Sequence, residues 1–240
     1  MRYAIFGDIH ANMEALQVVL EDSRSQRITQ YCCIGDIVGY NANPSECLEE
    51  IRKLNCPIVK GNHDEQASGM NELEGFNPLA SHAIQWTRDQ LSEEQKAFLR
   101  ELKFVRQVDA FTLVHATLDT PHKWGYVFDQ LAAAASFSYQ NTSLCFFGHT
   151  HVPLAFVRDT TVYGGTYDTI KIELGKKYFV NVGSVGQPRD GNPKTSYAIY
   201  DTVTRTVNLR RLDYDIAKAQ AKIIDAGLPK RLAERLAQGK

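Results

Sequence analysis

The sequence predicts an α/β protein with a parallel sheet and crossover helices. In the first half, short apolar runs typical of buried strands alternate with segments whose apolar residues recur at helical spacing. This alternation favours strand–helix–strand units. The last third is richer in strand-like segments. No linker, repeat or low-complexity tract interrupts the 240 residues, so we expect a single domain over residues 1–240, with C-terminal helices at 215–238 packed on it or extending it.

Each element is expected from its local pattern. Strands are predicted where buried-type apolar runs occur, at residues 3–6, 31–34, 56–59, 111–115, 143–147, 155–157, 161–163, 177–182, 196–200 and 206–212. Helices are predicted where helical periodicity or a capping pattern occurs, at residues 12–23, from 43, at 77–89, 92–102 and 129–135, and as a pair over 216–236 that is split at 227–229. Turns are expected at Gly164-Gly165 and Gly191-Asn192.

Bulk properties exclude several classes of protein. The formal net charge is −1, which gives no support for a general nucleic-acid-binding surface. The five cysteines form no C-x-x-C pair, so neither a disulfide framework nor a cysteine zinc site is expected, and the cytoplasm is the expected compartment. The apolar run at the start is too short for a signal-peptide core, and no stretch of about 18 apolar residues predicts a membrane span.

Polar residues that can bind metal follow the apolar strand runs directly. Four segments share this pattern, and each begins with glycine: Gly7-Asp8-Ile9-His10, Gly35-Asp36, Gly61-Asn62-His63-Asp64 and Gly148-His149-Thr150-His151. His115 ends a further strand run and is a weaker member of the set. Because sites form where loops leave the carboxyl ends of parallel strands, these segments can converge on one crevice.

The set contains the ligand types of a two-metal site. Its candidate ligands are Asp8, His10, Asp36, Asn62, His115, His149 and His151. Seven ligands are too many for one tetrahedral ion but suit two ions that share a carboxylate, and Asp36 could form that bridge. Nitrogen and oxygen donors without thiolate favour Mn, Fe, Zn, Co or Ni over Ca or Mg.

Each residue taken alone has an ordinary structural interpretation. Asp8 could cap the following helix, Asn62 could be a turn residue and His115 a core histidine. The pair His149 and His151 could belong to a polar loop. The joint occurrence of all these residues, in this order and after these strands, favours a metal centre.

The ordered motifs closely resemble those of the calcineurin-like metallophosphoesterase superfamily, in particular its small bacterial phosphodiesterase and phosphatase members. The resemblance covers residues 8–151 and implies a four-layer α/β/β/α sandwich of two mixed β-sheets flanked by helices. It implies that one metal is held by Asp8, His10, Asp36 and His151, and the other by Asp36, Asn62, His115 and His149. It also implies that His63 is not a ligand but contacts the substrate phosphate, beside Asn62, or protonates the leaving alkoxide.

The remaining candidates have alternatives of similar weight. Asp64 could orient His63 or could cap a helix. Arg189 lies in the glycine-rich stretch 183–191, whose amides could form an anion-binding nest, and it could bind a substrate phosphate or belong to an ordinary turn. His82 and Trp86 share a helix face and could cover the site, although core packing is the simpler interpretation.

The expected activity is metal-dependent hydrolysis of a phosphodiester or phosphomonoester by a metal-bridging hydroxide. The sequence lacks the arginine that follows the second-motif aspartate in the protein phosphatase branch, has Asp64 where that branch has glutamate, and has Ala116 where glycine is common. A dinucleoside polyphosphate hydrolase is the alternative enzyme, and a non-catalytic binding protein the alternative of another class. Substrate selectivity is expected to lie in the loops at residues 65–76, 117–126 and 183–191.

Overall fold

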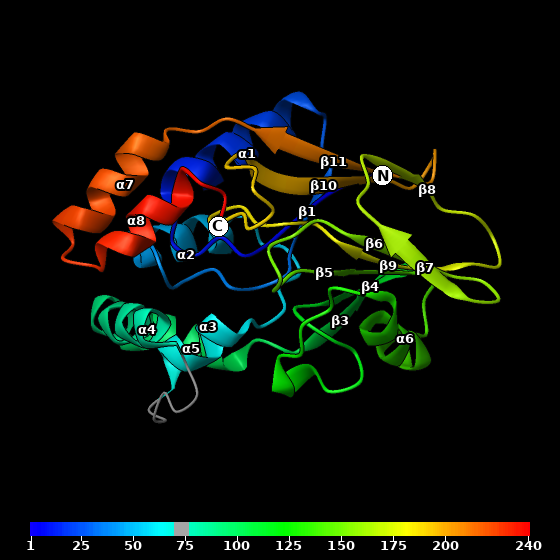
Figure 1. The fold of residues 1–240 in the computed structure, drawn as a ribbon, viewed down its shortest axis with the longest axis horizontal. Helices are drawn as coiled ribbons and strands as arrows, with labels where there is room; N and C mark the ends of the chain where they lie inside the picture. Colours follow the sequence, from blue (N-terminus) through cyan, green and yellow to red (C-terminus); the bar gives the residue numbers. More distant parts are fainter. Residues whose placement is uncertain (70–76) are drawn as a thin grey trace.

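The computed structural model describes residues 1–69 and 77–240, and its core is a pair of β-sheets (Figure 1). The first sheet has the strand order β2 (Gln30–Cys33), β1 (Arg2–Phe6), β10 (Thr195–Asp201), β11 (Thr206–Leu212) and β8 (Thr169–Lys171). The second has the order β3 (Val105–Val108), β4 (Phe111–Val114), β5 (Leu144–Phe147), β9 (Lys177–Asn181), β6 (Ala155–Arg158) and β7 (Val162–Gly165). The parallel pairs are β1 with β2 in the first sheet, and β4 with β5 and β5 with β9 in the second. The other pairs are antiparallel, so both sheets are mixed.

The two sheets pack face to face through one of the hydrophobic clusters. Along β1, Tyr3 and Ile5 point into this inter-sheet core, where Phe111 and Phe146 of the second sheet meet them. Ala4, on the alternate face of β1, packs with the helices instead. Successive side chains of a strand point to opposite faces of the sheet, and in β1 the side chains on both faces are apolar.

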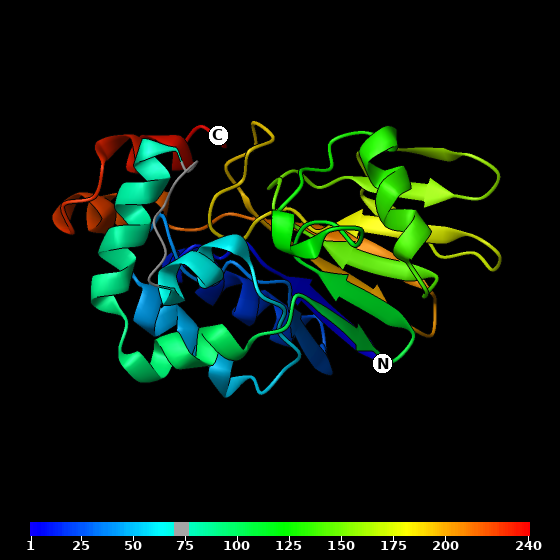
Figure 2. The ribbon, with the colours of Figure 1, turned by 90° about the horizontal axis from the view of Figure 1, so that it is seen from below.

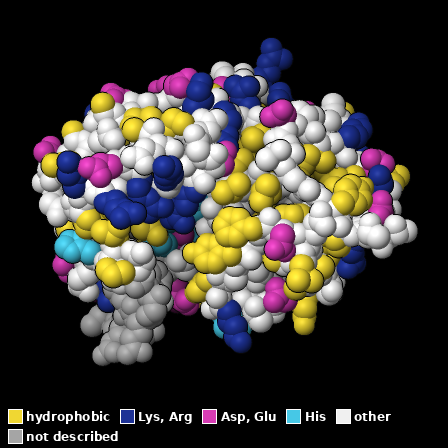
Figure 3. All heavy atoms as spheres, in the orientation of Figure 1, with side chains coloured by type: hydrophobic (Ala, Val, Ile, Leu, Met, Phe, Trp, Pro, Cys, Tyr) yellow, Lys and Arg dark blue, Asp and Glu magenta, His cyan; other side chains and the backbone are white. Residues whose placement is uncertain are grey.

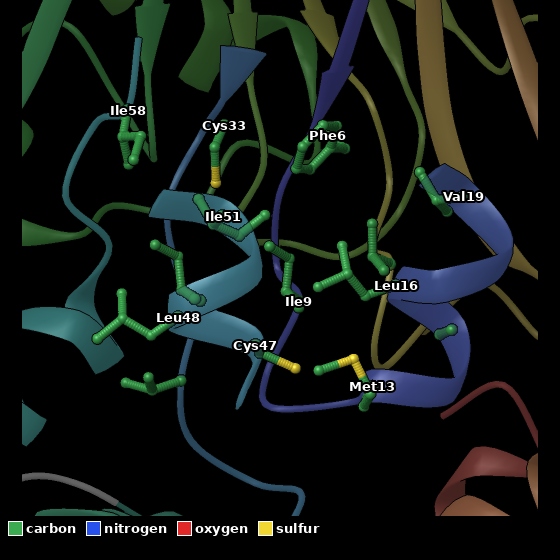
Figure 4. Packing of buried hydrophobic residues seen from close by; sticks show 14 of the residues in the cluster. Phe6, Ile9, Met13, Leu16, Val19, Cys33, Cys47, Leu48, Ile51 and Ile58 are labelled. Carbon is green, nitrogen blue, oxygen red and sulfur yellow. The ribbon is translucent and has the colours of Figure 1, made fainter. Parts of the chain in front are cut away.

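Helices cover the outer face of each sheet. On the first sheet, α1 (Met13–Ser25) and α2 (Pro44–Lys53) pack against Phe6 and Cys33 (Figure 4). On the second, α6 (Gln130–Tyr139) packs against Phe147 and Phe179 through Phe137. The layers are thus helix, sheet, sheet and helix, which confirms the predicted four-layer α/β/β/α sandwich.

A further group of helices lies at one end of the sandwich (Figures 1 and 2). It contains α4 (Pro78–Gln90), α7 (Ile216–Asp225) and α8 (Lys230–Leu236), which pack together through Ala83, Ile223 and Leu232. The other helical segments are α3 (Asn62–Ser68), α5 (Glu93–Glu101) and the 3-10 turn η1 (Pro121–Lys123). None of the helices formed by the described residues has the length and apolar character needed to span a membrane.

Capping residues set the helix starts much as predicted. The Asn12 side chain accepts a hydrogen bond from the amide of Ala15, so Asn12 and not Asp8 caps α1. The Ser92 capping box opens α5, and the last two helices are separated at residues 226–229. Asn43 precedes α2 without making a side-chain cap bond; it bonds Glu46 instead.

Several short elements differ from the prediction. Residues 56–59 form no named strand but only isolated bridges, Cys33–Ile58 and Val59–Lys103. Gly164-Gly165 is no turn, because both glycines pair with β6 as part of β7. β3, β8 and α3 have no counterpart in the predicted elements. β3 and β8 are three or four residues long and partly exposed, and so lack a periodic apolar signal.

Candidate metal centre

The candidate ligands converge where the parallel strands of both sheets end. Asp8 and Asp36 follow β1 and β2 of the first sheet, whereas His115 and His149 follow β4 and β5 of the second. All seven candidate ligands are buried. The site therefore lies where the carboxyl ends of two facing sheets meet, the usual place for a site in an α/β fold.

Two groups of ligand atoms share one carboxylate. Donor atoms of Asp8, His10, Asp36 and His151 all lie within 4.8 Å of one another, and so do those of Asp36, His115 and His149. Oδ2 of Asp36 lies 3.5 Å from Nε2 of His10 and 3.3 Å from Nε2 of His115. Asp36 thus stands between the groups, in the position of a bridging ligand.

Each histidine of the cluster uses one ring nitrogen to bond a main-chain carbonyl. Nδ1 of His10 bonds Val38 at 3.2 Å, and Nδ1 of His115 bonds Ile34 at 2.8 Å. Nδ1 of His151 bonds Gln187 at 2.6 Å, and Nε2 of His149 bonds Trp124 at 2.9 Å. Because a carbonyl can only accept, the bonded nitrogen of each ring carries a proton. In the neutral rings of His10 and His151 the other nitrogen, Nε2, presents its lone pair to the cluster.

This arrangement brings acceptor atoms into close contact. Nε2 of His10 and Nε2 of His151 are 3.0 Å apart. Burial lowers the pKa of both histidines, so both rings are neutral and their facing lone pairs repel each other. A cation bound by both nitrogens would turn this repulsion into attraction.

Asn62 adds an oxygen donor to the centre. It is the first residue of α3, and its side chain lines a cavity of about 220 Å³ together with Asp36 and His149. Its buried Oδ1 accepts no hydrogen bond from any residue that the structure describes. An unsatisfied buried oxygen beside histidine nitrogens and carboxylates is the donor set that a divalent ion with nitrogen and oxygen ligands needs.

The charges in the centre favour an ionised carboxylate. Burial alone would raise the pKa of Asp36, but His115 and His63 facing it hold that pKa well below its usual value. Burial would lower the pKa of His115, yet Asp36 raises it to about 9. Burial lowers the pKa of His149 to about 3.

The backbone of the centre is strained. Five of the seven candidate ligands have φ between 47° and 66°, the left-handed region that non-glycine residues rarely adopt; they are Asp8, His10, Asp36, His149 and His151. Gly61 and Gly148 permit the close packing around them, because a Cβ at either position would collide with the carboxylate of Asp36 or of Asp8. Such strain persists only where surrounding structure enforces it, as at functional sites.

Asp64 holds the loop that carries Asp36. Its carboxylate accepts hydrogen bonds from the amides of Asp36 and Ile37, both at 2.8 Å, and from that of Gly61 at 3.0 Å. The bond from Gly61 is the helix-capping bond that the sequence left open as one alternative. The bonds from Asp36 and Ile37 indicate that Asp64 also positions the Asp36 loop. Burial and the neighbouring Asp36 raise the pKa of Asp64 to about 7.

His63 lies beside the ligand cluster and lines the same cavity. Its ring centroid lies 4.7 Å from that of His10 and 4.4 Å from that of Tyr40. Burial lowers the pKa of His63 to about 4. His63 is therefore placed at the cavity wall, outside both groups of donor atoms.

The stretch 183–191 braces the centre and does not form the suggested anion nest. The amides of Val185 and Gly186 bond the carbonyls of Gly7 and Asp8, and the amide of Arg189 bonds the carbonyl of His151. These amides already have protein acceptors, which is why they cannot cradle an anion. The Arg189 side chain bonds Oε1 of Gln187 at 2.7 Å and lies over the Tyr40 ring, at the cavity wall.

Some wall residues carry no sequence signal. Tyr40, Trp124 and Tyr126 line the cavity, and Tyr126 stacks on His149 with ring centroids 4.2 Å apart. No motif marks them, because loops bring them to the site. Trp86 packs among the end helices and His82 is exposed, and neither lines the cavity. Of the predicted selectivity loop at 65–76, residues 70–76 lie outside the described part of the chain.

Comparison with known proteins agrees with this architecture. The family model of the calcineurin-like phosphoesterase superfamily domain matches residues 1–205. A crystal structure of a metallophosphoesterase from Sphaerobacter thermophilus is 39% identical, with a TM-score of 0.89 over 100% of this chain and 99% of that one. The uncharacterized protein MJ0912 of Methanocaldococcus jannaschii is 39% identical over 99% of this chain and 98% of its own length. Hypothetical protein PH1004 from Pyrococcus horikoshii OT3, 19% identical with a TM-score of 0.81 over 100% and 98% of the two chains, shares the fold.

The family match spans most of the chain, including all four glycine-led motifs and His115. The 39% identity extends over almost the full length of two relatives. The chain belongs to the calcineurin-like phosphoesterase superfamily.

Proposed function

We propose that this protein hydrolyses a phosphodiester or phosphomonoester at a centre that holds two divalent metal ions. The observation that carries the proposal is the position of Asp36, whose carboxylate belongs to both groups of donor atoms. Two ions that share a carboxylate are the arrangement that a two-metal phosphoester hydrolase requires.

The donor atoms divide between two ions. Asp8, His10, Asp36 and His151 would hold one, and Asp36, Asn62, His115 and His149 the other. The donor set favours Mn, Fe, Zn, Co or Ni. When bound, such ions lower the pKa of the attacking water and neutralise charge on the phosphate. The main-chain carbonyls behind the histidines fix the orientation of each ring beforehand.

The residues around the ions would handle the substrate. His63 would contact the phosphate, whose negative charge favours the protonated form of the ring, and would give that proton to the leaving oxygen. Asn62 lies beside it. Arg189 at the cavity wall binds phosphate oxygens, for which its guanidinium is suited. Asp64 acts through the Asp36 loop.

The test combines metal analysis and an activity screen on one preparation. Wild-type protein should hold two equivalents of metal and hydrolyse bis-p-nitrophenyl phosphate or a monoester when Mn is added. Asp36→Ala should lose both metal and activity, because both ions lose a ligand. A metal-loaded protein that is inert across a broad phosphoester panel would refute hydrolysis and support the alternative of a binding protein.

A dinucleoside polyphosphate is the alternative substrate, and assaying diadenosine tetraphosphate in the same screen separates the two. We also propose a cytoplasmic location, which the five free cysteine thiols support.

A further inference from the structure

A second, larger cavity adjoins the one at the metal centre. Its volume is about 890 Å³, against about 220 Å³ for the first. The two share wall residues, among them Tyr40, Tyr126 and Arg189. A molecule bound at the metal centre can therefore extend into the larger cavity past these side chains.

One wall of the larger cavity is rich in arginine. Arg231 and Arg235 of α8 line it together with Arg189 from the loop at 183–191. Figure 3 shows Lys and Arg side chains gathered over α8 on one side of the hollow, with hydrophobic side chains on the opposite side. Three guanidinium groups from two segments of the chain thus line the cavity beside the candidate metal centre.

No acidic side chain neutralises these positive charges. Within residues 1–69 and 77–240, none of the three arginines forms an ion pair with an Asp or Glu side chain. Glu234, also in the wall, pairs at 3.2 Å with Lys230 instead. Arg189 donates to the neutral amide of Gln187. Arg235 donates at 2.7 Å to the main-chain oxygen of Lys240, the last residue of the sequence, which is a carboxylate oxygen in a chain that ends there. Burial lowers the pKa of Arg235, and the like charges of Arg189 and Arg231 add to this effect.

The fold holds these like charges together. On α8, Leu232 and Leu236 are buried in the cluster that joins α8 to α4 and α7. That packing fixes the side of α8 that faces the cavity and keeps Arg231 and Arg235 there despite their repulsion. Arginines that no acidic side chain neutralises, held in place beside the cavity, are suited to bind an anion.

We infer that the larger cavity binds a second phosphate of the substrate, so that the natural substrate is a small molecule with at least one phosphate beyond the scissile one. This inference rests on the proposed function, which places the scissile phosphate at the metal centre. Arg231 and Arg235 would hold the additional phosphate, with Arg189 between the two positions and Tyr40 and Tyr126 as the walls.

The test uses inhibition of bis-p-nitrophenyl phosphate hydrolysis by AMP, ADP and ATP, with the metal kept in excess. In the wild type the inhibition constant should fall with each added phosphate. In Arg231→Gln and Arg235→Gln the ratio of the AMP inhibition constant to the ATP inhibition constant should fall by about 10-fold or more. This is the effect of losing a charge-assisted hydrogen bond. Arg231→Lys, which keeps the charge, should retain part of the preference for ATP over AMP.

Lys218→Gln is the matched control, because it removes one positive charge from the neighbouring helix α7, and neither Lys218 nor its partner Glu14 lines the cavity. It should leave the ratio of the ATP and AMP constants unchanged. Inorganic tripolyphosphate distinguishes the source of the phosphates: inhibition equal to that of ATP means that any polyphosphate fits, whereas tighter inhibition by ATP means that the nucleoside is also bound.

The two ways of failing are separable. If bis-p-nitrophenyl phosphate and every other phosphoester remain intact, the proposed function fails. If the enzyme is active but AMP and ATP inhibit equally, or if the Arg231→Gln and Arg235→Gln variants behave as Lys218→Gln does, the second phosphate site is refuted while the proposed function stands.

Discussion

The four histidines of the centre are oriented before any ion binds. A carbonyl behind each ring fixes which nitrogen carries the proton, and the free nitrogens of His10 and His151 are left 3.0 Å apart. This costs energy in the metal-free protein, because lone pairs face each other. The same geometry raises metal affinity, because the ion meets ligands that need no rearrangement.

His63 offers a sharp test at the scale of one residue. His63→Ala should keep the metal content of the wild type, because His63 lies outside both groups of donor atoms. Turnover of an ester with a poor leaving group should fall by about 10²–10⁴-fold, the usual contribution of a proton donor. An ester with a good leaving group needs the proton less and should lose less. Undiminished kcat on the poor leaving group would eliminate the proposed proton donor.

At this scale the sequence pointed to residues that follow strands and, among the loops, to Arg189, but no motif singled out Tyr126 or Arg235. The order of Asp8, Asp36 and His149 after apolar runs was enough to bring them together, because strand ends meet at one edge. The roles of Tyr126 and Arg235 depend on how a loop and a late helix fold back. No local sequence pattern predicts that these segments fold back toward the site.

Among the elements, α1 is linked to the first sheet by hydrogen bonds to the Asp22 carboxylate. Tyr197 of β10 and Arg210 of β11 both bond the Asp22 carboxylate, at 2.6 and 2.8 Å. Burial alone would raise the pKa of Asp22, but these bonds hold it below the usual value. The ionised carboxylate therefore stabilises the fold.

This tie predicts a pH-dependent effect of Asp22→Asn. A depressed pKa adds stability that is present above the unfolded-state pKa, about 3.9, and is lost as the pH falls through the folded-state value. The variant should be less stable by about 1 kcal/mol at pH 7, since the pair is partly exposed. Urea unfolding at pH 7 and pH 3 measures this, and a stability difference that does not shrink at pH 3 would contradict the assignment.

Helices were more predictable than short strands. Asn12 and Ser92 mark the starts of α1 and α5, because their side chains cap these helices, and a capping residue is a local sequence signal. β3 and β8 exist because a neighbouring strand offers hydrogen-bonding partners. Residues 56–59 have a strand-like composition but form only isolated bridges. Pairing depends on partners distant in sequence, which composition does not show.

For the whole molecule, the candidate metal centre lies between the two sheets and takes ligands from both. Asp8 and Asp36 come from the first sheet and His115 and His149 from the second, so bound ions would link the layers as well as serve chemistry. The sandwich itself was expected from the family resemblance and not from periodicity, because the pairing of two sheets face to face leaves no signature in any single segment.

This link predicts that metal removal destabilises the fold. Ions present at about 1,000 times their dissociation constant add about 4 kcal/mol of stability. For a chain of this size that corresponds to a rise in Tm of about 10 °C. Thermal unfolding before and after chelation should show this difference, and Asp36→Ala should not respond to the chelator. An equal response of both proteins would place the relevant ions elsewhere.

Anomalous diffraction from a crystal soaked in Mn²⁺ tests the central claim most directly. The account predicts two peaks that flank the Asp36 carboxylate, one among Asp8, His10 and His151 and the other among Asn62, His115 and His149. A single peak, or peaks away from Asp36, would contradict it.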